Sequence, residues 1–253
     1  MRLQIASDLH HQFSGAGLAT SRLLPISKEA DMLILAGNIH LSDAAINMYR
    51  DCGLPVVFVN GCIELHGADI GAARKVLFAR TAGTSMRYLE RTAFEQDHAR
   101  FLGCCLWTDY CLGSRRPERV ISAANRCSID HRLIRYGRKS FGAEHAVKEH
   151  ASSRAWLARQ LAKTFDGATV VVTHHAPSIK SIPLALRNRE ECAALASELD
   201  DLVAKADVWI HGLIPDTLDY TIGRARVICN ARGLPWESHA ARRRFEPEFV
   251  IKL

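Results

Sequence analysis

The chain has 253 residues, of which 48% are hydrophobic and 24% charged, an ordinary balance for a soluble globular protein. It holds no apolar run near the ~20 residues that a membrane-spanning helix needs and no N-terminal segment laid out like a secretion signal, so we expect a cytoplasmic protein without a membrane partner. The net charge is +6, and the excess comes mostly from short arginine runs at residues 115–116, 132–139, 187–189 and 242–244. These runs lack the interleaved aromatic residues of a surface that stacks nucleic-acid bases, so nucleic acid is disfavoured as a partner.

The first predicted element is a strand within residues 2–10, whose end places Asp8 and His10 in a loop. Side chains two apart on a strand share a face, so these two groups are expected to converge. A carboxylate oxygen and an imidazole nitrogen suit Mn, Fe, Zn or Ni better than Ca or Mg. On its own the pair is weak evidence for a metal site, because Asp and His at strand ends are more often capping or surface residues.

Two further strands follow, over residues 31–36 and 55–59, and both are continuously apolar. Such runs predict strands that are covered on both faces. Helices are predicted from 42 or 43 to 50 and over 68–80. The first third therefore alternates strands with crossovers, and polar residues follow each strand at its C-terminal end, where open α/β sheets place their ligands.

The rest of the chain is predicted to hold short strands, further helices and a closing hairpin, with residues 111–143 basic and mostly irregular. Expected helices cover 117–124, 144–165 and 190–204. Expected strands cover 87–89, 93–95, 100–107, 168–172 and 207–210, followed by a hairpin of 218–222 with 226–230 and a last strand at 248–252. Without a repeat or linker, a single domain over residues 1–253 is expected, and its eight irregularly spaced cysteines are expected to be reduced thiols.

The order of the strand-end motifs resembles the calcineurin-like metallophosphoesterases, and especially their small bacterial members. These motifs are D-x-H from Asp8, G-N from Gly37, G-x-x-E from Gly61, T-H-H from Thr173 and W-x-H-G from Trp209. Further matching segments are 101–103, 106–109, 130–134, 153–157, 171–177 and 229–233. The resemblance covers nearly the whole chain. It implies an α/β (α+β) fold, a four-layer αββα sandwich of two mixed sheets flanked by helices, with a two-metal site at the strand ends.

Some of the family's motifs are intact in this sequence. The first motif supplies two metal ligands and is matched by Asp8 and His10, and the fourth supplies a histidine ligand, matched by His174. The glycines that shape the strand-end turns are also retained, and we expect them to supply positive φ angles; they are Gly37, Gly61 and Gly212. The loops are therefore expected to keep the shapes that the family's site requires.

Other positions depart from the family's pattern. Asn38 stands where an Asp normally bridges two metals, and Cys62 and Ile63 replace an Asn ligand and the His that acts as general acid. Leu213 and Pro215 stand where two His ligands are normally found. A bridging carboxylate offsets the repulsion between two ions ~3.5–4 Å apart, and general acid catalysis is worth ~100- to 10,000-fold. We therefore expect no working two-metal site of the family type.

A reduced site is the remaining metal hypothesis. At most one divalent ion, Mn, Fe, Zn or Ni, would be held by Asp8, His10 and His174 together with Asn38 or Cys62. The alternative is that these residues are packed or solvated remnants of an active ancestor, and the same two interpretations apply to three histidines beside the altered motifs, His40, His66 and His211.

Two functions follow from the resemblance. The first is a phosphoesterase with weak, one-metal or lost activity, in which His175, His211 and Arg232 contact the phosphate. The alternative is a non-catalytic protein that uses the same pocket to bind a phosphorylated ligand or partner. In both cases the expected partner is a phosphorylated small molecule or a phosphodiester.

Overall fold

The fold was determined as a computed structural model, which describes residues 1–13, 23–113, 116–187, 190–236 and 245–253. The arginine run at 242–244 and parts of those at 115–116 and 187–189 lie outside the described residues. Within the described part, no helix is long and apolar enough to cross a bilayer.

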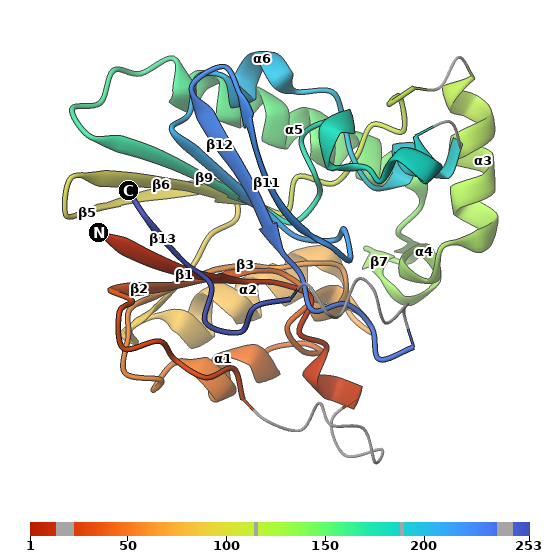
Figure 1. The fold of residues 1–253 in the computed structure, drawn as a ribbon. Coiled ribbons are helices and arrows are strands. Elements are labelled where there is room, and N and C mark those ends of the chain that lie inside the picture. Colours follow the sequence, from red (N-terminus) through yellow and green to blue (C-terminus); the bar gives the residue numbers. More distant parts are fainter. Residues whose placement is uncertain (14–22, 114–115, 188–189, 237–244) are drawn as a thin grey trace.

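Two mixed sheets form the centre of the molecule (Figure 1). In the first sheet, β1 to β4 are parallel and β13 is antiparallel to β1. Its order is β13 (Val250–Lys252), β1 (Arg2–Ala6), β2 (Met32–Ala36), β3 (Val56–Val59) and β4 (Met86–Tyr88). The continuous apolar runs of the sequence therefore form parallel strands with both faces covered, as predicted.

The second sheet has four parallel strands between two antiparallel edge strands. Its order is β11 (Thr217–Ile222), β12 (Ala225–Asn230), β10 (Val208–His211), β9 (Ala168–Thr173), β6 (Ala99–Cys104) and β5 (Thr92–Gln96). The predicted closing hairpin is confirmed as β11 and β12.

The two sheets pack face to face across a core of fully buried side chains, among them Ile5 and Ile34 from the first sheet and Phe101 and Val172 from the second. Helices α1 (Ala44–Tyr49) and α2 (Ile70–Thr81) cover the outer face of the first sheet, whereas α5 (Ala143–Leu161) and α6 (Asp200–Val203) cover that of the second (Figure 1). The arrangement is the predicted αββα sandwich.

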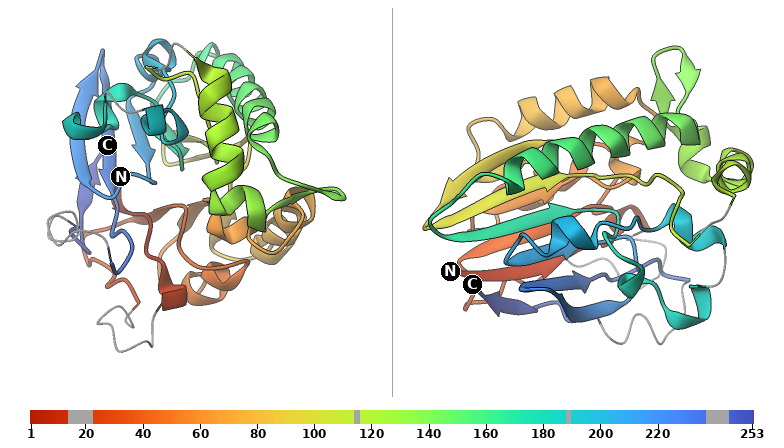
Figure 2. Two further views of the ribbon diagram at one scale, coloured as in Figure 1. Left: turned by 90° about the vertical axis from the view of Figure 1, so that its right-hand side faces the viewer. Right: turned by 90° about the horizontal axis from the view of Figure 1, so that it is seen from above.

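A smaller group of elements lies across the ends of the strands, and Figure 2 shows it in front in its left view. It comprises α3 (Pro117–Cys127), α4 (Ile129–Leu133) and a short hairpin of β7 (Arg135–Tyr136) with β8 (Lys139–Ser140). The helix predicted at 117–124 is thus present, but α4 and the hairpin occupy a segment that was predicted to be irregular.

Short 3₁₀ helices complete the described structure: η1 (His11–Phe13), η2 (Ile63–Leu65), η3 (Ile179–Ser181), η4 (Leu184–Leu186) and η5 (Glu190–Ala194).

Two helix predictions were wrong in extent, and tertiary contacts explain both. The helix expected over 190–204 is broken into η5 and α6, because the chain between them pairs with the segment after β9: Ala176 donates to the Leu195 carbonyl, and Ser197 donates back to Ala176. Helix α5 ends at Leu161 rather than at 165, and the guanidinium of Arg100 binds the carbonyls of Gln160 and Lys163 at this end.

Candidate functional site

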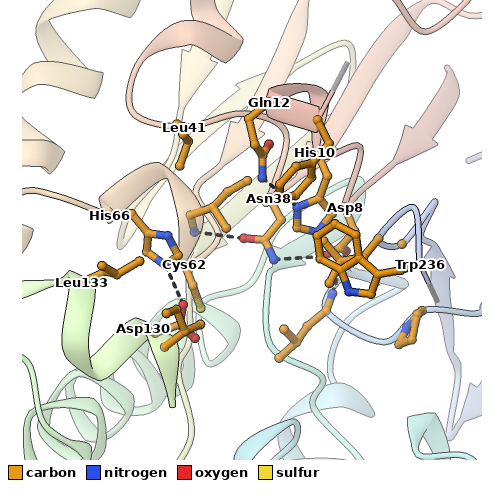
Figure 3. Close-up of a pocket in the computed structure, with 17 residues that line it drawn as sticks. Asp8, His10, Gln12, Asn38, Leu41, Cys62, His66, Asp130, Leu133 and Trp236 are labelled. Carbon is orange, nitrogen blue, oxygen red and sulfur yellow. Dashed lines mark hydrogen bonds and ion pairs between the residues drawn. The ribbon is translucent and has the colours of Figure 1, made fainter. Parts of the chain in front are cut away.

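The C-terminal ends of the parallel strands of both sheets meet at one edge of the molecule (Figures 1 and 2). Asp8 follows β1, Asn38 follows β2, Cys62 follows β3 and His174 follows β9. A cavity of about 450 Å³ opens at this edge and is lined by Asp8, His10, Asn38 and Cys62. Four of the five predicted metal-ligand positions therefore share one cavity, whose other walls are mainly apolar: Phe13, Leu41, Ile63, Ile129, Leu133, Leu213, Pro215, Leu234 and Trp236 (Figure 3).

Asp8 and His10 converge for a different reason from the one expected. They do not belong to a strand, because β1 ends at Ala6 and both residues have left-handed backbones, with φ of 51° and 45°. Asn38 and Leu213 are left-handed too, with φ of 56° and 65°. Such conformations cost on the order of 1–3 kcal/mol each for non-glycine residues and gather at functional sites.

The central contact of the cavity is a hydrogen bond between two predicted ligand positions. The amide Nδ2 of Asn38 donates to Asp8 Oδ1 over 3.0 Å (Figure 3). The backbone N of Leu213 donates to Asp8 Oδ2 over 2.8 Å. Asn38 Oδ1 in turn accepts from the backbone N of Ile63 at 3.1 Å. The Nδ2 of Asn38 faces an acceptor, Asp8 Oδ1, and its Oδ1 faces a donor, the N–H of Ile63. These two contacts define the orientation of the amide group.

Glu64 holds the surrounding loops together, a role that the motif comparison did not assign. Its carboxylate is 1% exposed and accepts three backbone N–H groups: those of Asn38 (3.1 Å), Ile39 (2.7 Å) and Gly61 (2.8 Å). Burial raises the pKa of Glu64, although these hydrogen bonds act in the opposite direction. The side chain ties the loop after β2 to the loop after β3, and these loops carry the cavity residues Asn38 and Ile63.

The expectation that three glycines supply positive φ was right only for Gly37, whose φ is 88°. Gly61 and Gly212 are needed for close approach instead. A Cβ on Gly61 would lie 2.5 Å from the backbone N of Asn38, and one on Gly212 would lie 2.6 Å from the Ala36 carbonyl oxygen. The loops at these positions leave no room for a side chain.

The imidazoles of the predicted ligand set differ in how they are engaged. His10 Nε2 lies 3.9 Å from Asp8 Oδ1. His174 is fully buried and its Nδ1 is 2.9 Å from the carbonyl oxygen of Ala36, which fixes Nδ1 as the donor. Its Nε2 has no hydrogen-bond partner among the described residues.

The described part of the chain contains no group of three or more His, Cys, Asp or Glu side chains that could hold a metal ion. Both oxygens of Asp8 already accept hydrogen bonds, and burial raises the pKa of the Cys62 thiol well above its usual value, which disfavours the thiolate that a metal requires.

None of the three predicted phosphate-contacting residues lines the first cavity. His175 lines a second cavity and its Nδ1 is 3.3 Å from the Cys105 carbonyl oxygen. Both ring nitrogens of His211 are engaged by the protein, with Ser181 Oγ at 2.8 Å and the Gly212 carbonyl oxygen at 2.9 Å. Arg232 does not line the first cavity, but its charge lowers the pKa of His10 and of His11.

An additional polar pair lies in the first cavity. His66 Nε2 and Asp130 Oδ1 are 2.7 Å apart and both residues line it (Figure 3). The sequence marked His66 only as a histidine beside an altered motif. Its partner lies 64 positions further on, so nothing local to either residue indicated the pair.

The buried histidines predict a loss of stability in acid. Burial lowers the pKa of His10, His11 and His211 to about 4 from 6.5. The unfolded chain binds these protons near pH 6.5 and the folded chain only near 4, so stability is complete above about pH 6.5 and falls as the pH drops towards about 4, by about 1.4 kcal/mol per pKa unit at each group. Urea unfolding at about pH 7.5 and about pH 5 should show this loss. His211→Gln should reduce it, and an unchanged loss in that variant would contradict the assignment.

Comparison with known proteins agrees with this architecture. The chain is similar to the phosphopantetheinyl hydrolase from Mycobacterium tuberculosis, with a TM-score of 0.74 and 17% identity over 98% of this chain and 94% of that one. It is also similar to a dimetal phosphatase from Danio rerio, with a TM-score of 0.50 and 13% identity over 90% and 86% of the two chains. By sequence, no family model and no curated protein matches. The chain thus has a metallophosphoesterase-like fold, as expected from its motifs.

Proposed function

We propose that this protein binds a phosphorylated small molecule or a phosphodiester in the cavity at Asp8, and that hydrolysis by a two-metal mechanism has been lost. The observation that carries the proposal is the hydrogen bond from Asn38 to Asp8. It joins the two positions at which the resemblance implies metal ligands, and it satisfies them without an ion. The Asn38 amide donates a hydrogen bond to this carboxylate and carries no negative charge, so it does not offset the repulsion between two cations as a bridging carboxylate would.

The phosphorylated ligand class is supported by the fold and by charge. The similar structure that spans nearly the whole of both chains is named a phosphopantetheinyl hydrolase. The carboxylate of Asp8 is covered by two N–H donors and that of Asp130 by His66, which limits their repulsion of an anion. The guanidinium of Arg232 adds positive potential near His10.

Binding can be tested with inorganic phosphate and with methylphosphonate, in the presence of a chelator, by calorimetry and by thermal stabilisation. We expect binding without metal, weakened several-fold by Arg232→Gln, because this variant removes a positive charge that acts on the cavity at His10. The matched control is Arg159→Gln on the exposed face of α5, which should leave binding unchanged. Equal weakening in the two variants, or no binding at all, would refute the proposal.

A second candidate is a weak one-metal phosphoesterase. The observations that favour it are the 3.9 Å separation of His10 Nε2 from Asp8 Oδ1 and the unpartnered Nε2 of buried His174. Metal analysis of purified protein, with hydrolysis of bis(4-nitrophenyl) phosphate in added Mn, separates the two functions. Turnover that is lost in Asp8→Ala would establish the enzyme, whereas no metal and no turnover above that variant would leave the binding function.

A further inference from the structure

A second cavity of about 450 Å³ adjoins the first one. Three residues, Cys62, Asp130 and Leu213, line both cavities, so the two spaces share a wall. Together they fall within the ~300–1,000 Å³ of typical small-molecule sites. The outer wall of the second cavity comes from α3, including Val120 and Ala124.

Aromatic and heteroaromatic rings dominate the inner wall of the second cavity. Trp107 and His175 lie with ring centroids 5.2 Å apart, and a 2.9 Å hydrogen bond joins Tyr110 Oη to His131 Nε2. Burial lowers the pKa of both His131 and His175, so these imidazoles are neutral at physiological pH. These rings thus form an uncharged part of the wall, beside the carboxylate of Asp130, and this part suits stacking with another ring.

One polar group in this wall is unused. The indole Nε1 of Trp107 is buried and has no hydrogen-bond partner among the described residues, and the residue is 2% exposed. An unpaired buried donor costs about 1–3 kcal/mol of folding free energy, and a ligand acceptor that reaches this N–H would offset that cost. Trp107 and Tyr110 also have left-handed backbones, with φ of 54° and 58°. Of the eleven described non-glycine residues with positive φ, six line one of the two cavities: Asp8, His10, Asn38, Trp107, Tyr110 and Leu213.

We infer that the second cavity is a subsite for a flat aromatic ring that carries a hydrogen-bond acceptor. The ligand of the proposed function, on which this inference rests, is then a phosphorylated aromatic compound. Its ring lies against Trp107 and His175, and its phosphate extends past the shared wall at Cys62 towards Asp8 and His10.

Saturation-transfer NMR with phenylphosphonate, methylphosphonate and neutral benzamide tests this subsite. Phenylphosphonate should bind about tenfold or more tightly than methylphosphonate, because ring stacking adds to the shared phosphonate contact. Benzamide, which has a ring and a carbonyl acceptor but no charge, should bind on its own. Ala124→Trp fills the cavity and should abolish both ring effects, whereas Arg119→Trp, on the exposed face of the same helix, should preserve them.

A second variant covers the case in which Ala124→Trp does not fold. Trp107→Phe keeps a ring but removes the indole donor, and it should weaken benzamide binding about fivefold or more. Benzamide binding that depends on Ala124 or Trp107 supports the subsite, whether or not a phosphonate binds. If benzamide binds in this way and neither phosphonate does, the proposed function is refuted and the subsite stands. Methylphosphonate binding with no advantage for either ring compound would overturn the subsite and leave the proposed function intact.

Discussion

Asn38→Asp is expected to cost about 2–4 kcal/mol of folding free energy at neutral pH and to make the stability of the protein respond to Mn. The substitution removes the donor of the 3.0 Å hydrogen bond and sets a second carboxylate against Asp8, where the two residues are 6% and 4% exposed. Two buried carboxylates at this distance repel each other unless one takes up a proton or a cation lies between them.

Both responses of the Asn38→Asp variant, the uptake of a proton and the binding of Mn, can be measured. The folded variant binds a proton more readily than its unfolded chain, so its stability should rise as the pH is lowered from neutral, the reverse of the trend expected from the buried histidines. Mn should restore stability by about 2.7 kcal/mol at a hundredfold excess over its dissociation constant. Urea unfolding with and without Mn gives both quantities.

The control for this experiment is Asn230→Asp. Asn230 is also a buried strand-end asparagine, but its amide donates to the carbonyls of Ile5 and Glu246 and no second carboxylate lies against it among its described partners. This variant should lose stability without a Mn response. If Asn38→Asp were as stable as the parent and insensitive to Mn, the proposed role of the Asn38–Asp8 contact would be wrong.

Glu64→Ala is expected to destabilise the protein by about 3–5 kcal/mol, because three buried backbone donors lose their acceptor at once. Glu64→Gln retains one oxygen but turns an NH₂ group towards a donor, and should cost about 1–3 kcal/mol. Glu95→Ala, at an exposed position on β5, should stay within about 0.5 kcal/mol of the parent.

Denaturant unfolding ranks the three variants by their free energy of unfolding. Ligand binding in the cavity gives a second, independent measurement. Because Glu64 joins the loops after β2 and β3, Glu64→Ala should also abolish phosphonate binding under conditions in which the variant is still folded. A loss below about 1 kcal/mol in Glu64→Ala would contradict the role assigned to this carboxylate.

The sheets and the position of the site could be predicted because both depend on signals local to each strand. The apolar runs ending at Ala36 and Val59 are long enough for buried strands, and polar residues follow them directly. Parallel pairing then places these ends at one edge, whatever the details of the loops. This is why Asp8 and Asn38 were predicted to lie together, although the strand conformation expected at Asp8 and His10 was wrong.

The remaining features depend on contacts between distant parts of the chain. The interruption between η5 and α6 comes from pairing with Ala176, and the His66–Asp130 pair spans 64 positions. The aromatic cavity joins residues from the loop after β6, from α3 and from the segment after β9, and no single stretch of sequence carries its pattern. Likewise, the sequence marked Asn38 as a departure from the family but could not show that its amide would be satisfied by Asp8 and Ile63.

The most direct test of the proposal that two-metal hydrolysis has been lost is anomalous diffraction at the Mn absorption edge from crystals soaked in Mn and phosphate. The hydrogen bond between Asn38 and Asp8 predicts that no pair of Mn peaks lies beside these residues, and that the Asn38 Nδ2–Asp8 Oδ1 contact persists near 3.0 Å. Two well-ordered peaks ~3.5–4 Å apart in this cavity, with Asn38 turned to offer its oxygen, would contradict it.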